Sequence, residues 1–180
     1  MSKLGFLVAV SVVSLGAAVG AWYYKYQLYG WLPSTASSEL KNVDGLLMDK
    51  EGKPFTGRVK DISDSGYSLY AYKDGKLDGL NVVFSEGQLR EIGHWENGEQ
   101  NGLFEAWTDK GVLVDHGIFK DGERDGETVQ YWPDTGKLKV KAQYRAGKLN
   151  GLVEQYYPSG TVGSVRISVS GEVIPGAAQR

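Results

Sequence analysis

The sequence predicts an all-β array of stacked β-hairpins, preceded by one apolar N-terminal helix. Three observations predict it. Glycines recur with a period in the twenties, two short apolar-aromatic runs lie in each period, and an uncharged run opens the chain. A chain of 180 residues suits one modest domain or a short repeat array, and its 25 glycines are about double the usual share of roughly 7%.

The N-terminal segment has the properties of a membrane anchor. Residues 4–21, "LGFLVAVSVVSLGAAVGA", carry no charge. A helix rising about 1.5 Å per residue would let them approach the roughly 30 Å hydrocarbon core of a bilayer. The next stretch is rich in aromatic residues, which favour the membrane–water boundary, and begins with Trp22, Tyr23 and Tyr24. We therefore expect residues 1–31 to form an anchor helix with an aromatic belt.

Two features of this segment have alternative interpretations. The small residues 19–21 after a basic start also suit a cleaved signal peptide, which would make the protein secreted. Gly16 and Gly20 form a small-xxx-small pair that lets two helices approach closely, although small residues are common in such segments. The three-residue N-terminal tail favours a cytoplasmic N-terminus in a single-pass protein. The array would then be exported to the periplasm or cell exterior.

The rest of the chain divides into a linker over residues 32–45, a repeat array over 46–173 and a tail over 174–180. The linker contains "PSTASS", which is typical of a flexible connector. The array is defined by successive spacings of 22, 23, 24 and 25 residues between equivalent glycines, and two further glycine series keep the same period. A fixed period of this length predicts stacked supersecondary units. The first series is Gly57, Gly79, Gly102, Gly126 and Gly151.

Each period contains two runs in which apolar and polar residues alternate, as in "LFEAW", and this alternation favours strands over helices. Asp-Gly and Asn-Gly pairs between the runs favour tight turns, because glycine adopts positive φ without a steric clash. We therefore take Gly79, Gly102, Gly126 and Gly151 as structural turn glycines. Large aromatic residues recur at two positions of the period and suit either cross-strand packing or a protein-binding surface. The candidate interaction surface is Trp95, Trp107, Phe119, Tyr131, Tyr144 and Tyr156.

The repeated unit resembles the bacterial variant of the MORN repeat. The resemblance rests on "DGKLDGLNVVFSEGQL", "NGEQNGLFEAWTDKGVL", "DGERDGETVQYWPDTGKL" and "AGKLNGLVEQYYPSGTV", and covers roughly residues 46–173. It implies an elongated, twisted antiparallel sheet with roles in protein contacts, self-association or membrane proximity. Some bacterial members carry an antitoxin label. The pattern is degraded at both ends, where Ile62 replaces an aromatic residue and Ser168 interrupts the last strand.

Nothing in the sequence indicates catalysis or a cofactor. Cysteine is absent, and the only two histidines, His94 and His116, belong to no metal-binding motif. Lysines interrupt the acidic turn residues, which lack the spacing of a calcium loop. A net charge of −2 gives no broad attraction for nucleic acid. We expect no enzyme, no metal and no nucleic-acid partner.

The combined features predict a membrane-anchored repeat scaffold that mediates protein–protein interactions near a bilayer. The alternative is an antitoxin-like binder that neutralises a partner toxin. A second copy of the chain is a further candidate partner. Lys137, Lys139 and Lys141 are expected on one strand face, where they suit either solvent or an acidic or lipid partner.

Overall fold

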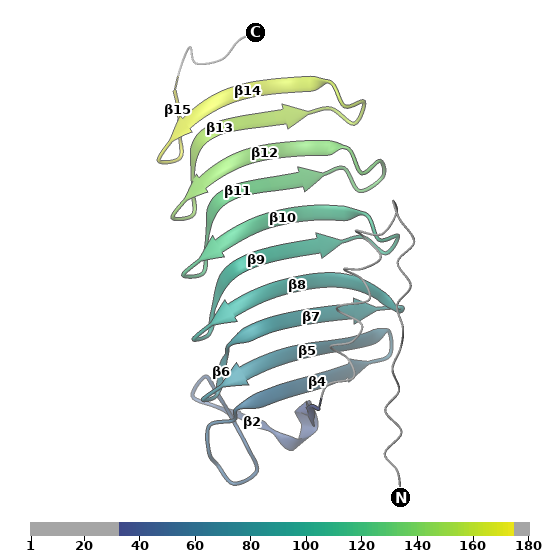
Figure 1. Cartoon of the computed structure of the whole chain (residues 1–180), viewed down its shortest axis with the longest axis vertical. Coiled ribbons are helices and arrows are strands. Elements are labelled where there is room, and N and C mark those ends of the chain that lie inside the picture. Colours follow the sequence, from purple (N-terminus) through teal and green to yellow (C-terminus); the bar gives the residue numbers. More distant parts are fainter. Residues whose placement is uncertain (1–32, 175–180) are drawn as a thin grey trace, which may run out of the picture. The chain divides into compact units, whose positions relative to one another are not determined.

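A computed structural model describes residues 33–174, in which nearly all strands belong to one 13-stranded, predominantly antiparallel sheet (Figure 1). Successive long strands along the chain are also neighbours in the sheet, so the sheet is a meander of hairpins. Its long strands are β4 (Gly57–Ser63), β5 (Gly66–Lys73), β7 (Gly79–Ser85), β8 (Gln88–Glu96), β9 (Glu99–Trp107), β10 (Leu113–Lys120), β11 (Glu123–Tyr131), β12 (Leu138–Arg145), β13 (Lys148–Tyr156) and β14 (Val162–Val169).

Short elements lie at both ends and beside β5: β1 (Thr35–Ala36), the 3-10 helix η1 (Ser37–Glu39), β2 (Lys41–Val43), β3 (Leu46–Met48), β6 (Lys76–Leu77) and β15 (Glu172–Val173). The predicted all-β array of hairpins is therefore confirmed. Over residues 33–174, no helix is long and apolar enough to cross a membrane. The predicted anchor helix, with Gly16, Gly20, Trp22, Tyr23 and Tyr24, lies outside the described residues.

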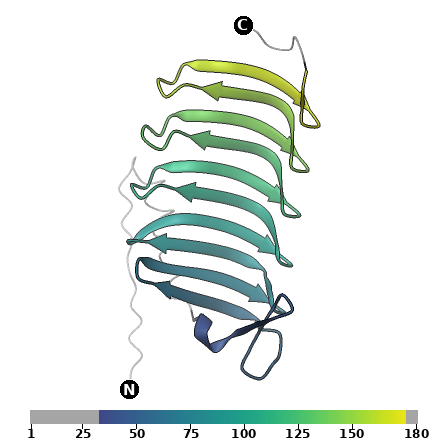
Figure 2. The ribbon, with the colours of Figure 1, turned by 180° about the vertical axis from the view of Figure 1, so that it is seen from behind.

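Two-residue turns occupy one edge of the array, and most connections along the other edge are longer loops (Figure 2). In the turn Asn97-Gly98 both residues have positive φ, at 53° and 93°, and Asp121-Gly122 repeats this geometry at 50° and 79°. These angles are those of type I′ turns, which match the twist of a hairpin. Each turn also contacts the preceding hairpin: the Gly98 N–H donates to the Leu77 carbonyl at 2.8 Å, and Gly122 donates to Gln100 at 3.0 Å.

The glycines predicted as turn glycines lie just beyond these turns, at or near the start of the next strand. Between the pairs Gly93↔Phe104 and Trp95↔Gln100, β8 advances two residues and β9 advances four, so β9 bulges by two residues at Asn101-Gly102. The same two-residue bulge recurs at Asp125-Gly126 and at Asn150-Gly151. Gly79, Gly102, Gly126 and Gly151 have φ of 113°, 114°, 118° and 130°, and so hold equivalent backbone positions.

The acidic residue before two of these glycines links one hairpin to the next. The Asp78 carboxylate accepts a hydrogen bond from the Asn97 N–H at 3.3 Å, and the Asp125 carboxylate accepts one from the Ala146 N–H at 3.1 Å. Each acceptor lies in the bulge of one hairpin, and each donor lies in the tight turn of the following hairpin. The repeated Asp-Gly therefore supplies both the backbone bend and a hydrogen bond between repeats.

Replacing a bulge glycine with alanine is expected to destabilise the array. A Cβ on Gly151 would lie 3.0 Å from Cβ of Gln143, and one on Gly102 would lie 3.1 Å from Cβ of His94, in backbone conformations that L side chains rarely adopt. Gly151→Ala and Gly102→Ala should each lower the free energy of unfolding by about 1 kcal/mol or more. Thermal unfolding measures this, with the exposed Glu99→Ala as a control expected within about 0.5 kcal/mol. Equal melting temperatures would contradict the bulge register.

The two faces of the sheet follow from its cross-strand register, because directly paired residues share a face. One face, here the stripe face, carries a continuous row of pairs: Val82, Ile92, Glu105, His116, Val129, Lys141, Glu154 and Val165. The other, here the small-residue face, carries the row Asn81, Gly93, Phe104, Gly117, Thr128, Ala142, Val153 and Arg166.

Apolar burial on the stripe face is concentrated in the N-terminal half of the array. Its buried apolar members are Leu69, Val82, Phe84, Leu89 and Ile92, with exposed fractions from 0% to 7%, and Val129 of β11, at 8%. The first five belong to three neighbouring strands, β5, β7 and β8. In the C-terminal half, by contrast, several aliphatic side chains of this face are exposed.

The N-terminal end of the array is covered by short elements, one of which lies within residues 33–38, the predicted flexible connector. Strand β1 pairs in parallel with Val59 and Lys60 of β4, and Ser37 Oγ donates to Asp61 Oδ1 at 2.9 Å. Leu47 of the β2–β3 sheet donates to the Gly75 carbonyl at 2.8 Å. Backbone pairing to a sheet edge therefore outweighs the loop-like composition of "PSTASS".

Candidate functional site

The six aromatic residues predicted as one interaction surface lie on opposite faces of the sheet. Trp107, Tyr131 and Tyr156 each follow a residue of the stripe-face row by two positions and share that face. Trp95, Phe119 and Tyr144 stand in the same relation to Gly93, Gly117 and Ala142, on the small-residue face. All six side chains are partly buried. No flat partner could contact all of them at once.

On the small-residue face, two of the aromatic residues pack against the sheet itself. A Cβ on Gly93 would lie 3.3 Å from Trp95 Nε1, so the missing side chain makes room for the indole. Phe119 packs edge-to-face on Phe104, with ring centroids 5.8 Å apart, and the Arg124 guanidinium lies 4.9 Å from the Phe119 ring centroid. The aromatic rings on this face are therefore occupied by packing contacts within the sheet.

Arg124 is fixed above Phe119 by a two-point ion pair. Its Nη1 and Nη2 donate to Asp115 Oδ1 and Oδ2 at 3.1 and 2.7 Å, and Nη1 also donates to Thr128 Oγ1 at 3.2 Å. A Cβ on Gly117 would lie 2.5 Å from Nη1, so glycine is needed beneath the guanidinium. Phe119 is therefore a packing residue rather than a free contact surface.

The C-terminal half of the stripe face exposes several apolar side chains. Tyr131 pairs with Leu138, and Tyr156 pairs with Val162. Towards the turn edge, Leu152 pairs with Ile167. Exposed fractions are 55% for Val162, 43% for Leu152, 39% for Ile118 and 37% for Ile167. An aromatic row and an aliphatic row thus flank the middle of this face, as in an interaction surface.

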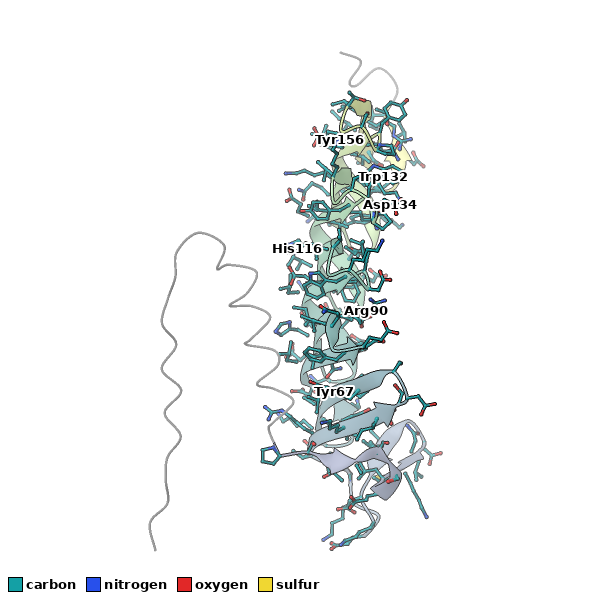
Figure 3. All side chains as sticks on the ribbon, turned by 90° about the vertical axis from the view of Figure 1, so that its right-hand side faces the viewer. Tyr67, Arg90, His116, Trp132, Asp134 and Tyr156 are labelled. Atoms are coloured by element: carbon teal, nitrogen blue, oxygen red, sulfur yellow. The ribbon has the colours of Figure 1, made fainter. Side chains whose placement is uncertain are left out.

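The row between these two apolar rows holds Val129 and Val165 together with polar and charged side chains. His116 Nδ1 lies 2.9 Å from Glu105 Oε1, and Lys141 Nζ lies 3.0 Å from Glu127 Oε2. The hydrogen bond to Glu127 and its negative charge raise the pKa of Lys141. The row gives the face alternating charges that a partner could match. Figure 3 views the sheet edge-on, with His116 on the opposite side from Arg90 and Trp132.

The three clustered lysines do not share a face, which corrects the expectation from their alternate spacing. Between the pairs Tyr131↔Leu138 and Gln130↔Val140, Lys139 is an extra residue, so the pleat shifts there. Lys139 Nζ lies 4.9 Å from the Trp132 ring centroid, and Lys137 Nζ donates to the Ser159 carbonyl at 2.7 Å. Only Lys141 lies in the stripe-face row.

Sequence reasoning missed a groove of about 420 Å³ beside the last two loops. Val140, Gln155 and Ser164 form its floor on the small-residue face, and the aromatic residues Trp132 and Tyr157 border it. It opens because Gly163 occupies the extra position that Arg90, Val114 and Lys139 fill in earlier hairpins. The sequence contains a signal for this groove, because the four residues recur at a regular spacing and only the last of them lacks a side chain.

Over residues 33–174, no group of three or more histidine or acidic side chains is placed to hold a metal ion. His94 and His116 lie in neighbouring rows of the stripe face, and His94 Nδ1 lies 3.3 Å from the Leu103 carbonyl oxygen. Comparison with protein-family models finds no match, and comparison with curated proteins finds none either.

Proposed function

We propose that the chain is a membrane-anchored repeat scaffold that presents the C-terminal half of its stripe face to a protein partner. The observation that carries this proposal is the exposure of Leu152, Val162 and Ile167 on that half, beside the partly buried Tyr131 and Tyr156, while the apolar core of the same face lies in β5, β7 and β8. A monomeric protein rarely exposes contiguous apolar area without a binding role. The resemblance of the repeats to MORN units supports a role in protein contacts.

The charge pattern of the face favours a protein over a lipid surface as the partner. The Lys141 charge is paired with Glu127, and Glu105 and Glu154 lie in the same row. Anionic lipids attract clusters of basic residues, whereas the middle row of this face sets one lysine beside acidic residues. A partner with apolar side chains on both sides of a charged strip would match the two rows.

The experiment is chemical cross-linking in native membranes, with the wild-type chain and Tyr131→Ser compared side by side. The proposal expects one protein to be recovered with the wild-type chain and lost with the variant. Recovery of the chain alone, as a cross-linked dimer, would instead identify a second copy as the occupant. Identical products from both chains would contradict the use of this face.

The anchor is proposed from the uncharged run 4–21 and the aromatic residues that follow it. The mature chain should retain Met1 or Ser2 and sediment with membranes after an alkaline wash, because a spanning helix is held by hydrophobic burial rather than by charge. A mature N-terminus near Trp22 would contradict this and indicate signal cleavage. Alkaline phosphatase fused after residue 180 should be active in a Gram-negative host if the array is exported.

A further inference from the structure

The two ends of the sheet differ in how their edge strands are covered. At the N-terminal end, β1 pairs with Val59 and Lys60 of β4, and the 3-10 helix η1 follows it. At the C-terminal end, β15 pairs only with Ser168 and Val169 of β14 (Figure 1). Within the described part of the chain, no strand pairs with the outer side of residues 162–166. This stretch of β14 is therefore an open sheet edge.

The register identifies the backbone groups that this open edge presents. The Ile174 N–H donates to the Ile167 carbonyl at 2.9 Å, so the backbone of Ile167 faces β15 rather than β13. In an antiparallel ladder, alternate residues face the same neighbouring strand. No bulge separates the pairs Leu152↔Ile167 and Glu154↔Val165, so the N–H and C=O of Val165 also face outwards. An additional strand would satisfy both groups in the geometry of the sheet.

The side chains along this edge are apolar on the stripe face. Val162, Ile167 and Val169 are 55%, 37% and 50% exposed, and they share that face with Val165. Terminal units of a repeat array usually carry a polar outer surface, and lysine or proline commonly protects an edge strand. Residues 162–169 contain neither lysine nor proline. The last long strand therefore lacks the usual protection against strand addition.

A second copy of the chain fits this edge poorly. In a two-fold pair of β14 strands, β15 of each copy would lie on the pairing side of its own β14. Antiparallel pairing places the end of one strand beside the start of the other, so this β15 would meet the loop 157–161 of the other copy. A strand that brings no hairpin neighbour on its pairing side avoids this clash. The geometry therefore favours an extended segment of a different protein.

The two faces of β14 specify the side chains of the added strand. Directly opposite residues share a face, so the residue opposite Val165 joins the stripe face and the residue opposite Arg166 joins the small-residue face. Arg166 forms no ion pair with any residue between 33 and 174, so its guanidinium can bind a carboxylate. Apolar residues suit the positions opposite Val165 and Val162, because cross-strand apolar pairs bury each other.

We propose that the open edge of β14 accepts one strand from a partner protein, with an acidic residue opposite Arg166 and apolar residues opposite Val165 and Val162. The added strand runs antiparallel to β14 and begins next to Ile174. This site uses the backbone of the sheet edge, so it goes beyond the proposed use of stripe-face side chains.

The test is a fluorescence anisotropy titration of the full chain in detergent with a peptide probe. The probe is acetyl-Glu-Val-Thr-Val-Thr with fluorescein at its C-terminal end, and it should bind saturably. N-methylation of its first valine removes the N–H that donates to the Val165 carbonyl, and should raise the dissociation constant about tenfold or more. N-methylation of the threonine that follows should leave binding unchanged, because that N–H faces away from β14.

Two substitutions test the same contacts from the side of the chain. Val165→Pro removes the outward N–H but no hydrogen bond between β14 and β13, and should weaken probe binding about tenfold or more at a nearly unchanged melting temperature. Arg166→Gln should remove the preference for glutamate over glutamine at the first position of the probe. Tyr131→Ser should leave probe binding unchanged, so failure of this inference and failure of the stripe-face proposal are distinguishable.

The methylated probes keep the test decisive if Val165→Pro unfolds, since they leave the chain unchanged. Absence of saturable binding by the wild-type chain, equal binding of the probe methylated at its first valine, or retained binding by folded Val165→Pro would each overturn the inference. Tighter probe binding after removal of residues 175–180 would identify the chain's own tail as the occupant. A wild-type dimer that Val165→Pro dissociates would identify a second copy. Either result would also overturn the assignment to a partner protein.

Discussion

Ile92→Ala is expected to lower the free energy of unfolding of the chain by about 2–5 kcal/mol. Ile92 is 0% exposed and shares the stripe face with Val82, Phe84 and Leu89, which are at most 7% exposed. Removing its outer carbon atoms leaves a cavity, because rigid strand backbones limit how far the neighbouring side chains can move. Denaturant unfolding of the full chain in detergent measures the loss.

The matched control is Ile167→Ala, which makes the same chemical change on the same face. Ile167 lies in β14 and is 37% exposed, so less apolar surface is lost and water fills the space. Ile167→Ala should therefore lower the free energy of unfolding by well under half as much as Ile92→Ala does. Equal losses at the two sites would show that the stripe face is packed alike along its length, and the exposed C-terminal half would not exist in solution.

Tyr131→Ser is expected to weaken partner retention more than tenfold while changing the melting temperature little. Aromatic anchors at interfaces commonly contribute about 2 kcal/mol or more when truncated, which corresponds to more than a tenfold change in affinity. Tyr131 is partly exposed on the face that carries the aromatic and aliphatic rows. The measurement pairs the melting temperature with partner retention for each variant.

Trp95→Ser is the contrasting variant, because Trp95 packs above Gly93 on the small-residue face. It should lower the melting temperature clearly, and partner retention should fall only as far as the folded fraction falls. The same contrast is expected between Trp107→Ser and Phe119→Ser. If every variant that loses the partner also unfolds, both aromatic series are packing residues and the proposed surface fails.

The repeat period and the turns could be predicted from the sequence, because glycine and Asp-Gly or Asn-Gly signals act locally. Gly98 and Gly122 lie in type I′ turns, where positive φ is required at both central residues. The position of Gly102 and Gly126 inside bulges could not be predicted. A bulge depends on how many residues the facing strand contributes, and that register is set between strands rather than within one.

The register between strands also explains why the six candidate surface residues are divided between the two faces of the sheet. Strict alternation would place Lys137, Lys139 and Lys141 on one face, but the extra residue in β12 turns Lys139 towards Trp132. Trp95 and Trp107 looked equivalent as large aromatic residues, yet the pairs Gly93↔Phe104 and Ile92↔Glu105 put them on opposite faces. Residue type predicted which positions carry large or charged side chains, whereas cross-strand register determines the face of the sheet on which each side chain lies.

The most direct measurement compares two adjacent residues of β11 that face opposite ways. A photo-crosslinking amino acid is placed at Gln130, which pairs with Val140 on the small-residue face, or at Tyr131, which pairs with Leu138 on the stripe face. The chain is then irradiated in native membranes. The account predicts a covalent product with a partner protein from position 131 and none from position 130. A product from position 130 alone, or equal products from both, would contradict the claim that the stripe face is the binding surface.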